Sequence, residues 1–372
     1  MKTKIEFRGV SKSYGEVQVL HDLNFSIEEN EFFVLFGPAG AGKTTIMKLI
    51  AGLEFVSSGT ILIDGKDATA IAPEKRKIRM AFENFTLYPH LTVFENLASP
   101  LRNNKYSKQE IKNRVQKTAQ MLEIDPYLNR LPKQLSGGQK QRVSLGRALV
   151  MESGVYLLDE PLAHLDAKLR SELRSEFQNL KTSLRNSTVV YVTHDYTEAM
   201  SLGDRVCVIE DKKIVQIDTP QSIYNNPRNV SVARMFGQPE INILPMETDL
   251  HKKTVFNQLF EIPLAGTPLE AHLDLYGKPS VIFGCRPRDW EFSLEHGYFQ
   301  DGFVQGEVVG FEIKNFRGII LSRLENGQYI SVSCDEYSPV APGSRIYLKP
   351  NPAAGYLFDA DTEQNVSLGR EM

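Results

Sequence analysis

The chain has 372 residues and a formal net charge of −3 at pH 7; 41% of the residues are hydrophobic and 24% are charged. These values are those of an ordinary globular protein that is long enough for two or more domains. No apolar run approaches the roughly 18 residues that cross a bilayer, and none near the N-terminus resembles a secretion signal, so we expect a cytoplasmic chain.

The first part of the sequence alternates between strand and helix patterns. Residues 1–30 alternate apolar and polar side chains, as antiparallel strands do. The nearly continuous apolar run at 31–36 ends in glycine and indicates a buried strand of the kind found in parallel sheets. Two more such runs follow at 155–158 and 188–192, and helical patterns separate them at 44–51, 108–122 and 167–184. This alternation predicts an α/β core that binds ligand at the carboxyl ends of its strands.

A glycine-rich turn joins the first buried strand to the first helical pattern. It reads Gly37-Pro38-Ala39-Gly40-Ala41-Gly42-Lys43-Thr44, and Thr45 follows. Glycines allow backbone N–H groups to surround phosphates, the lysine reaches the β- and γ-phosphates, and the next hydroxyl can ligate Mg²⁺. Such a turn can be purely structural, but the buried strand before it and the amphipathic helix after it favour a nucleotide-binding P-loop. Thr45 would add a contact at the helix N-terminus.

A second glycine-containing turn precedes another helical pattern. It reads Ser136-Gly137-Gly138-Gln139. Its bare N–H groups and the positive end of the helix dipole suit an anion. By itself the string could be an ordinary N-cap with Ser136 as the capping residue. Its position between the P-loop and the acidic pair described next favours a role in nucleotide binding.

Polar side chains also end the other two buried strands. Asp159 and Glu160 follow the apolar run at 155–158. Burying acids there is unfavourable unless they bind a cation or take part in proton transfer. His194 follows the run at 188–192 and could reach the same edge of the sheet, although a lone histidine at a strand end is more often structural.

The chain changes character after about residue 235. Prolines become frequent, and short strand-like runs separated by turn signals cover 280–283, 302–311, 318–324, 329–334 and 345–348. They predict a small β-barrel domain. Residues 240–372 contain 11 Lys and Arg against 19 Asp and Glu, a net charge of −8, which argues against nucleic-acid binding. The three widely spaced cysteines are expected to be reduced thiols.

The P-loop, the Ser-Gly-Gly-Gln turn and the Asp-Glu pair, in that order, resemble the ATPase subunit of an ABC transporter. Nearly the whole chain is similar to ATPase subunits of maltose- and glycerol-phosphate-type carbohydrate importers, through further strings at 87–93, 159–162, 165–170, 193–195, 198–200 and 284–287. The resemblance implies an α/β P-loop ABC ATPase domain at 1–237 with a helical subdomain at about 84–150. It also implies a C-terminal, all-β, OB-like domain at 238–372 for regulation and dimerisation.

The resemblance implies ATP and Mg²⁺ as cofactors and gives roles to individual residues. Thr44 would ligate Mg²⁺, and Asp159 would hold it through water. Glu160 would be the general base that polarises the attacking water, and His194 would be the switch histidine at the γ-phosphate. Tyr14 would stack on adenine, although a lone tyrosine before glycine is a weak signal.

Two further residues take their roles from the resemblance alone. Asp166 would contact the opposing subunit. Glu83 departs from the family, which has Gln at this position to sense Mg²⁺ and the attacking water. Glu83 could ligate Mg²⁺ directly and retune the coupling to transport, or it could do the work of Gln unchanged. A third alternative is that the chain pairs with a different ATPase that retains Gln.

The resemblance also implies partners and a location. Because Ser136–Gln139 is expected far from the P-loop of its own domain, two subunits would sandwich two ATP molecules head to tail, as a homodimer or a heterodimer. Residues 84–97 would line the groove for one of two integral-membrane permeases, with an external solute-binding protein acting indirectly. The subunit would then lie on the inner face of the membrane.

Other functions fit parts of this pattern. Importers of spermidine, iron and sulfate share the two-domain plan, so the solute could belong to another class. A soluble ABC ATPase of DNA repair or translation is disfavoured by the single P-loop module, the lack of sustained heptads and the acidic tail. The tail also permits a regulatory interaction as an additional role.

Overall fold

The structure is a computed structural model, and it describes residues 2–82, 87–163, 167–314, 317–335 and 339–368. Glu83 and Asp166 lie outside the described residues. The chain forms two compact units, residues 1–221 and 222–372. The boundary between the units lies earlier in the chain than the predicted boundary at 237/238. The reason is that Val230 and Ala233 pack in one buried cluster with Ile241 and Phe358 of the second unit.

An antiparallel sheet opens the first unit, as the alternation in residues 1–30 predicts. Its strand order is β2-β1-β4-β5, and its strands are β1 (Thr3–Tyr14), β2 (Val17–Glu28), β4 (Ser58–Ile63) and β5 (Lys66–Asp67). Inward-facing residues such as Phe7 and Phe25, whose rings stack 4.5 Å apart, join the main core of this unit. Burial of such apolar area is the main stabilising contribution here.

The central sheet has the order β10-β9-β3-β8-β7-β6. Strands β3, β6, β7, β8 and β9 run parallel, and β10 adds an antiparallel edge. The bounds are β3 (Phe32–Phe36), β6 (Ile78–Ala81), β7 (Val155–Asp159), β8 (Thr188–Thr193), β9 (Arg205–Glu210) and β10 (Lys213–Asp218). Every residue of β3, β7 and β8 is buried, which is why these strands appear in the sequence as continuous apolar runs.

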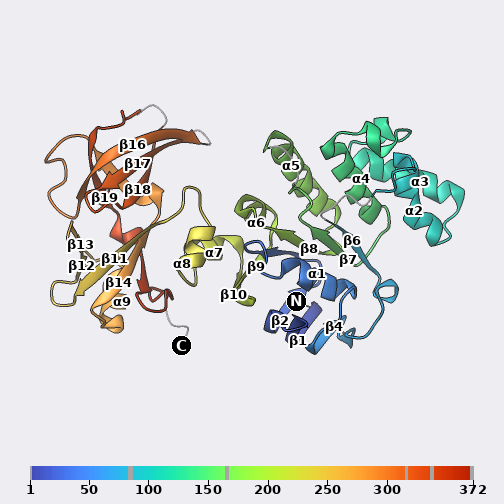
Figure 1. Ribbon diagram of the computed structural model, residues 1–372, viewed down its shortest axis with the longest axis horizontal. Helices are drawn as coiled ribbons and strands as arrows, with labels where there is room; N and C mark the ends of the chain where they lie inside the picture. Colours follow the sequence, from blue (N-terminus) through green and yellow to red (C-terminus); the bar gives the residue numbers. More distant parts are fainter. Residues whose placement is uncertain (1, 83–86, 164–166, 315–316, 336–338, 369–372) are drawn as a thin grey trace. The chain divides into compact units, whose positions relative to one another are not determined.

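Helices cover both faces of this sheet (Figure 1). Phe33 and Val190 belong to the same core cluster as residues of α1 (Lys43–Ala51). Their neighbours Phe32 and Tyr191 point to the opposite face, where Phe177 of α5 (Ala167–Ser183) meets the Tyr191 ring edge-on at 5.7 Å. The short helix α6 (Tyr196–Leu202) follows β8. The helix bounds agree closely with the predicted patterns at 44–51 and 167–184.

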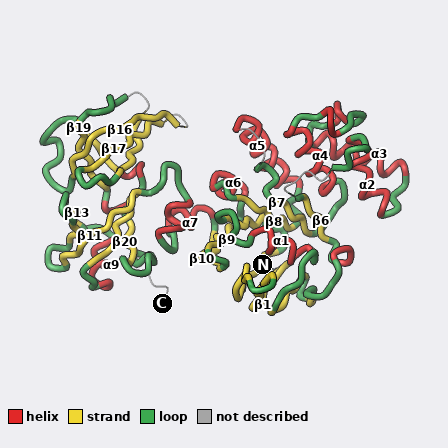
Figure 2. Tube along the Cα trace, viewed as in Figure 1, coloured by secondary structure: helices red, strands yellow, loops and turns green. Residues whose placement is uncertain are grey.

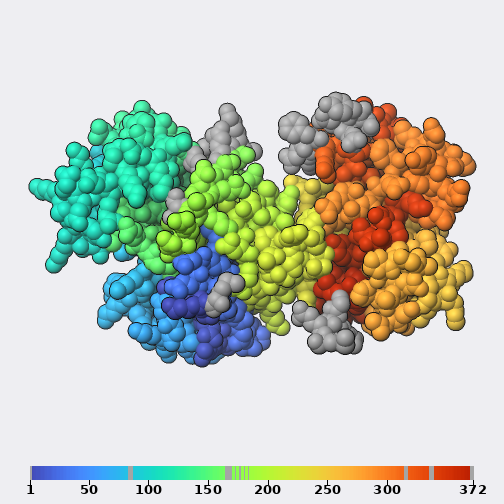
Figure 3. Space-filling view, turned by 180° about the vertical axis from the view of Figure 1, so that it is seen from behind, coloured from blue at the N-terminus to red at the C-terminus, as the bar shows by residue number. Residues whose placement is uncertain are grey.

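A helical layer lies beside the edge strand β6. It contains α2 (Val93–Asn103), α3 (Lys108–Met121) and α4 (Gly137–Leu149). Each of the three begins with a capping box, in which Thr92, Ser107 or Ser136 accepts a hydrogen bond from the backbone N–H three residues on. In the space-filling view these residues form a teal lobe that stands apart from the blue N-terminal strands (Figure 3).

The second unit is built mainly from β-strands (Figure 2). Its sheets have the orders β13-β12-β11-β14-β20 and β15-β19-β16-β17-β18, and neighbouring strands in both are antiparallel. The strands are β11 (Asn242–Asp249), β12 (Thr254–Phe256), β13 (Glu261–Pro263), β14 (Ser280–Cys285), β15 (Trp290–Ser293), β16 (Val304–Lys314), β17 (Arg317–Leu324), β18 (Tyr329–Asp335), β19 (Arg345–Pro350) and β20 (Tyr356–Asp359). The predicted β-rich character is observed, whereas the OB-like topology stays a prediction.

Short helices complete this unit and the connections. They are α7 (Pro220–Asn225), α8 (Val230–Met235) and α9 (Leu269–Tyr276), and single 3-10 turns at η1 (Pro73–Lys75), η2 (Asp125–Tyr127), η3 (Pro132–Gln134), η4 (Pro287–Asp289) and η5 (Pro352–Ala354). Within the described part of the chain, no helix is both long enough and apolar enough to span a bilayer.

Candidate functional site

Three sequence motifs meet at one edge of the central sheet. Strands β3, β8 and β7 are adjacent and parallel, so their carboxyl ends lie side by side. The P-loop follows β3, His194 follows β8, Asp159 ends β7, and Glu160 follows it. Parallel pairing therefore gathers these side chains at the position where α/β sheets bind ligands.

The P-loop backbone requires glycine at two positions where its path is tight. Gly37 has φ +156°, and a Cβ there would lie 2.2 Å from the carbonyl oxygen of Ile209. Gly42 has φ +100° and precedes α1, and a Cβ there would lie 2.5 Å from Leu20. These glycines thus let the loop pass close to β9 and then enter the helix, which leaves N–H groups at its N-terminus for an anion.

The ammonium group of Lys43 is buried within this loop. Its Nζ donates to the carbonyl oxygens of Gly37 and Pro38, both at 2.9 Å, and its side chain is only 5% exposed. The Lys43 Nζ also lies 3.8 Å from Glu160 Oε1. A positive charge is therefore held over the inside of the loop, where a phosphate would be bound.

Thr44 and Asp159 bring oxygen ligands together from two elements. The Thr44 hydroxyl at the start of α1 donates to Asp159 Oδ1 at 3.3 Å. Asp159 is only 3% exposed, whereas Thr44 is open to solvent. A hydroxyl beside a carboxylate is the kind of hard-oxygen set that Mg²⁺ prefers. Among the described residues no group of three or more His, Cys, Asp or Glu could hold a metal alone, so phosphate oxygens would have to complete such a site.

Glu160 is the central carboxylate of the site. Its Oε2 lies 3.0 Å from His194 Nδ1, a distance that suits a hydrogen bond from a protonated Nδ1. Its backbone has φ 41°, an uncommon conformation for a residue other than glycine. Backbone strain of this kind is concentrated at functional sites, where the surrounding structure maintains it.

A buried pair behind His194 was not predicted from the sequence. The Tyr191 hydroxyl donates to Glu198 Oε2 at 2.9 Å, and both side chains are buried. Burial raises the pKa of Glu198 and raises the pKa of Tyr191 well above its usual value. Asp195 caps α6 by accepting from the Thr197 N–H at 2.7 Å. These bonds therefore fix the turn that carries His194 on both sides. In the sequence, the spacing Asp195-x-x-Glu198 is typical of a helix start and could have indicated this arrangement.

Other predicted site residues lie elsewhere in the first unit. Ser136 caps α4 and exchanges hydrogen bonds with Gln139, so these two residues have local partners within their own helix start. Gly137 and Gly138 form the first turn of α4. Tyr14 ends β1, is 43% exposed, and has Lys12 Nζ 4.6 Å from its ring centroid. Its exposure leaves ring surface accessible for stacking.

Comparison with known proteins gives the family. The family model described as "ABC transporter" matches residues 20–163. An sn-glycerol-3-phosphate import ATP-binding protein of Cereibacter sphaeroides is 39% identical over 96% of this chain and 98% of its own. The chain belongs to the ATP-binding proteins of ABC transporters. An alpha-glucoside transport ATP-binding protein of Rhizobium meliloti is 37% identical over 96% of this chain and 98% of its own.

A solved structure confirms the fold of the first unit. It is a dimeric, post-hydrolysis state of the ATP-binding cassette MJ0796 bound to ADP and Pi. It is 32% identical, covers 58% of this chain and 98% of its own, and has a TM-score of 0.53. Family membership makes this chain a transport-coupled ATPase that uses ATP.

Proposed function

We propose that this chain is the ATP-hydrolysing subunit of an importer for a sugar, a polyol or a glycerol-phosphate-like solute. The observation that carries the proposal is the meeting of Lys43, Asp159 and Glu160 at one sheet edge. It is supported by similarity, over almost the full chain, to glycerol-phosphate and alpha-glucoside transport proteins.

The P-loop residues Gly37–Thr45 bind the phosphates of ATP in this proposal. The Lys43 ammonium, now bonded to two loop carbonyls, turns to the phosphates, and the N–H groups at the start of α1 complete the cradle. Thr44 and Asp159 would hold Mg²⁺. When bound, Mg²⁺ neutralises charge on the phosphates that are being separated.

Glu160 acts as the general base. Its carboxylate accepts a proton from the attacking water, and His194 holds the carboxylate through the Nδ1 contact. The Tyr191–Glu198 pair and the Asp195 cap keep His194 in this position. Phosphoryl transfer depends mainly on such positioning and charge, because little covalent chemistry is left for the protein to do.

The remaining predicted residues act across a subunit interface. Ser136, Gly137, Gly138 and Gln139 bind the ATP held by the P-loop of a second ATPase subunit. Tyr14 stacks on the adenine in its own subunit. Asp166 is proposed to contact the second subunit and Glu83 to sense Mg²⁺ and water, with the three alternatives for Glu83 still open.

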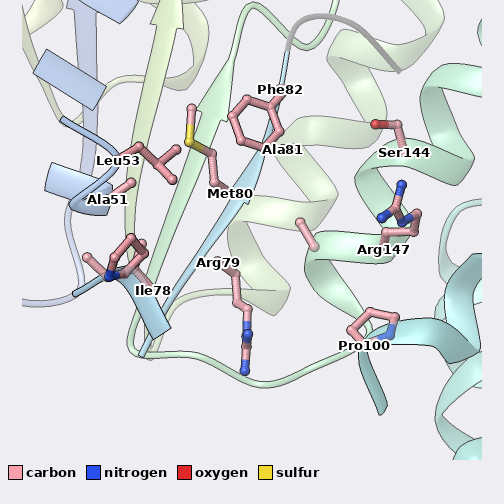
Figure 4. Close-up of a pocket in the computed structure, with 12 residues that line it drawn as sticks. Ala51, Leu53, Ile78, Arg79, Met80, Ala81, Phe82, Pro100, Ser144 and Arg147 are labelled. Atoms are coloured by element: carbon pink, nitrogen blue, oxygen red, sulfur yellow. The ribbon is translucent and has the colours of Figure 1, made fainter. Parts of the chain in front are cut away.

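Residues 84–97 are proposed to line the groove for the permease, and a cavity beside the helical layer would extend that groove. Met80 of β6 and Phe82 just after it lie across a cavity of about 290 Å³ from Ser144 and Arg147 of α4, with Pro100 of α2 at one side (Figure 4). A groove with an apolar wall and a basic side chain suits a short helix of a membrane partner. The subunit would then work at the inner face of the membrane with two permeases and, indirectly, a solute-binding protein. The second unit would be the OB-like domain.

Reconstitution tests this function. The chain is co-purified with its permeases, placed in proteoliposomes with the solute-binding protein, and supplied with ATP on its own side. Radiolabelled maltose, glycerol and glycerol 3-phosphate are then offered on the other side. ATP-dependent uptake of any of these, absent with Glu160→Gln, supports the proposal. Recovery of the chain without a permease would contradict it.

A further inference from the structure

A cavity of the second unit is lined by basic side chains. It has a volume of about 250 Å³, and its lining includes Arg286, Arg288, Arg317, Ser333 and Tyr224. Among the described residues that line it there is no Asp or Glu. The cavity is therefore a concentration of positive charge, and its small size suits a compact ligand better than a protein surface.

The charge of this cavity is opposite to that of its surroundings. Residues 240–372 have 11 Lys and Arg against 19 Asp and Glu, a net charge of −8. Such a domain repels anions at long range, so an anion would have to be bound through local contacts. Three arginines, with no Asp or Glu among the described lining residues, provide a local positive charge that a bound anion could neutralise.

Arg286 provides a fixed charge at the cavity wall. It is 1% exposed, and its Nη atoms donate to the carbonyl oxygens of Tyr224 at 2.5 Å and Phe236 at 2.6 Å. Its guanidinium lies 3.7 Å from the Tyr224 ring centroid. Within the described residues it makes no ion pair, so its charge is held in place by neutral groups alone. Such a charge is stabilised by an anion nearby.

Arg288 and Arg317 have side chains that can reach a ligand. Arg288 is 52% exposed, lies 5.1 Å from the Tyr224 ring centroid, and has only a long contact of 3.6 Å to Asp289, its neighbour in the chain. Arg317 begins β17 and is exposed, and within the described residues its side chain makes no hydrogen bond or ion pair. Two guanidinium groups with this freedom can bind an oxyanion bidentately.

A second hollow continues from this cavity. It has a volume of about 500 Å³, shares Arg288, Arg317 and Ser333 with the first, and adds Trp290, Phe292 and Tyr298 together with Glu291. Aromatic side chains offer flat apolar surface and, in Trp and Tyr, a polar group. The two hollows together thus provide a cationic part and an aromatic part that meet at the two arginines.

We propose that these hollows bind a small molecule that carries a phosphate group. Arg288 and Arg317 donate to the phosphate oxygens, the Ser333 hydroxyl adds a further donor, and Arg286 supplies charge from behind. The carbon body of the ligand lies against the aromatic side chains. The shared chemistry is the phosphate oxyanion, whose source is either a phosphorylated metabolite or free phosphate. This proposal does not rest on the function proposed above.

Calorimetric titration of the full-length protein tests this site. The probes are glycerol 3-phosphate, glucose 6-phosphate, inorganic phosphate and, as an uncharged control, glucose. Lys43→Ala is titrated in parallel, so that binding at the P-loop, which this variant is expected to weaken, is distinguished from binding in the second unit. We expect at least one phosphate compound to bind and glucose not to bind. Tighter binding of an ester than of inorganic phosphate assigns a metabolite to the site; equal binding assigns free phosphate.

The variants Arg288→Ala and Arg317→Ala locate the binding. Each removes charged hydrogen bonds, so affinity is expected to fall by about tenfold or more. Arg323→Ala is the matched control, because Arg323 also lies on β17 but pairs with Glu307 at 3.3 Å. Circular dichroism and ADP affinity check that each variant is folded. Absence of binding to the wild-type protein, or equal affinity in all variants, would overturn the proposal.

Discussion

The carboxylate of Glu160 lies between the ring of His194 and the ammonium group of Lys43. Glu160 Oε2 is 3.0 Å from His194 Nδ1, and Oε1 is 3.8 Å from Lys43 Nζ. These three residues follow three different strands, β7, β8 and β3. A carboxylate, an imidazole and an ammonium group therefore meet at one edge of the sheet, as the roles proposed for them require.

Replacing Glu160 by Gln is expected to abolish turnover while ATP still binds. Gln keeps the shape of the side chain but cannot accept the proton of water, and loss of a general base lowers rates by about 10²–10⁴-fold. Steady-state ATPase activity and binding of a fluorescent ATP analogue measure the two properties. The control is Glu152→Gln, since Glu152 is 88% exposed. Retained turnover would remove Glu160 from the role of base.

Replacing Lys43 by Ala is expected to weaken ATP binding by about tenfold or more. The change removes the positive charge that the P-loop holds for the phosphates, and charged hydrogen bonds contribute about 1.5–3 kcal/mol each. Nucleotide titration measures the loss. Lys48→Ala, on the same helix, is the control. Wild-type affinity in the Lys43 variant would contradict the assignment of the P-loop.

Replacing Arg286 by Ala is expected to destabilise the second unit by about 3 kcal/mol or more. The buried guanidinium donates to the carbonyls of Tyr224 and Phe236, and these acceptors would lose their partners. Chemical denaturation followed by circular dichroism gives the change. Arg323→Ala, at a half-exposed site, should remain within about 0.5 kcal/mol of the wild type. An equally small effect at Arg286 would show that its bonds do not stabilise the unit.

Asp359 is expected to make stability depend on pH in the acid range. The Lys278 ammonium, at 2.5 Å, and the backbone N–H of Thr362 hold the pKa of Asp359 well below its usual value. A pKa that is lower in the folded state stabilises it above the unfolded pKa of about 3.9. This stabilisation is lost as the pH falls towards the folded pKa.

The test is the free energy of unfolding measured between about pH 6 and pH 3. Asp359→Asn should flatten its pH dependence, because the variant has no proton to gain at this site. Asp361→Asn is the matched control, since Asp361 is 80% exposed and lies 3.4 Å from the same Lys278 Nζ. Identical slopes in the wild type and Asp359→Asn would refute the prediction.

Long elements of the fold were predictable because their patterns are local. The apolar runs of β3, β7 and β8 and the helical patterns of α1 and α5 agree with the structure to within one or two residues. The three-residue strands β12 and β13 were not predicted, because three residues are too few to show an alternation. β20 and the helix α9 were also missed.

The sequence by itself determined the chemistry available at the site. The P-loop and Lys43 come directly after the buried strand β3, and Asp159 and Glu160 come at the end of the buried strand β7. A short stretch of sequence therefore predicts that each of these groups lies at the carboxyl end of its strand. Only the tertiary structure decided which atoms meet. Parallel pairing brings His194 to Glu160, and the fold of the second unit brings Arg286 to Tyr224 and Phe236. Such contacts join residues far apart in the chain, whose meeting depends on packing and leaves no local periodicity.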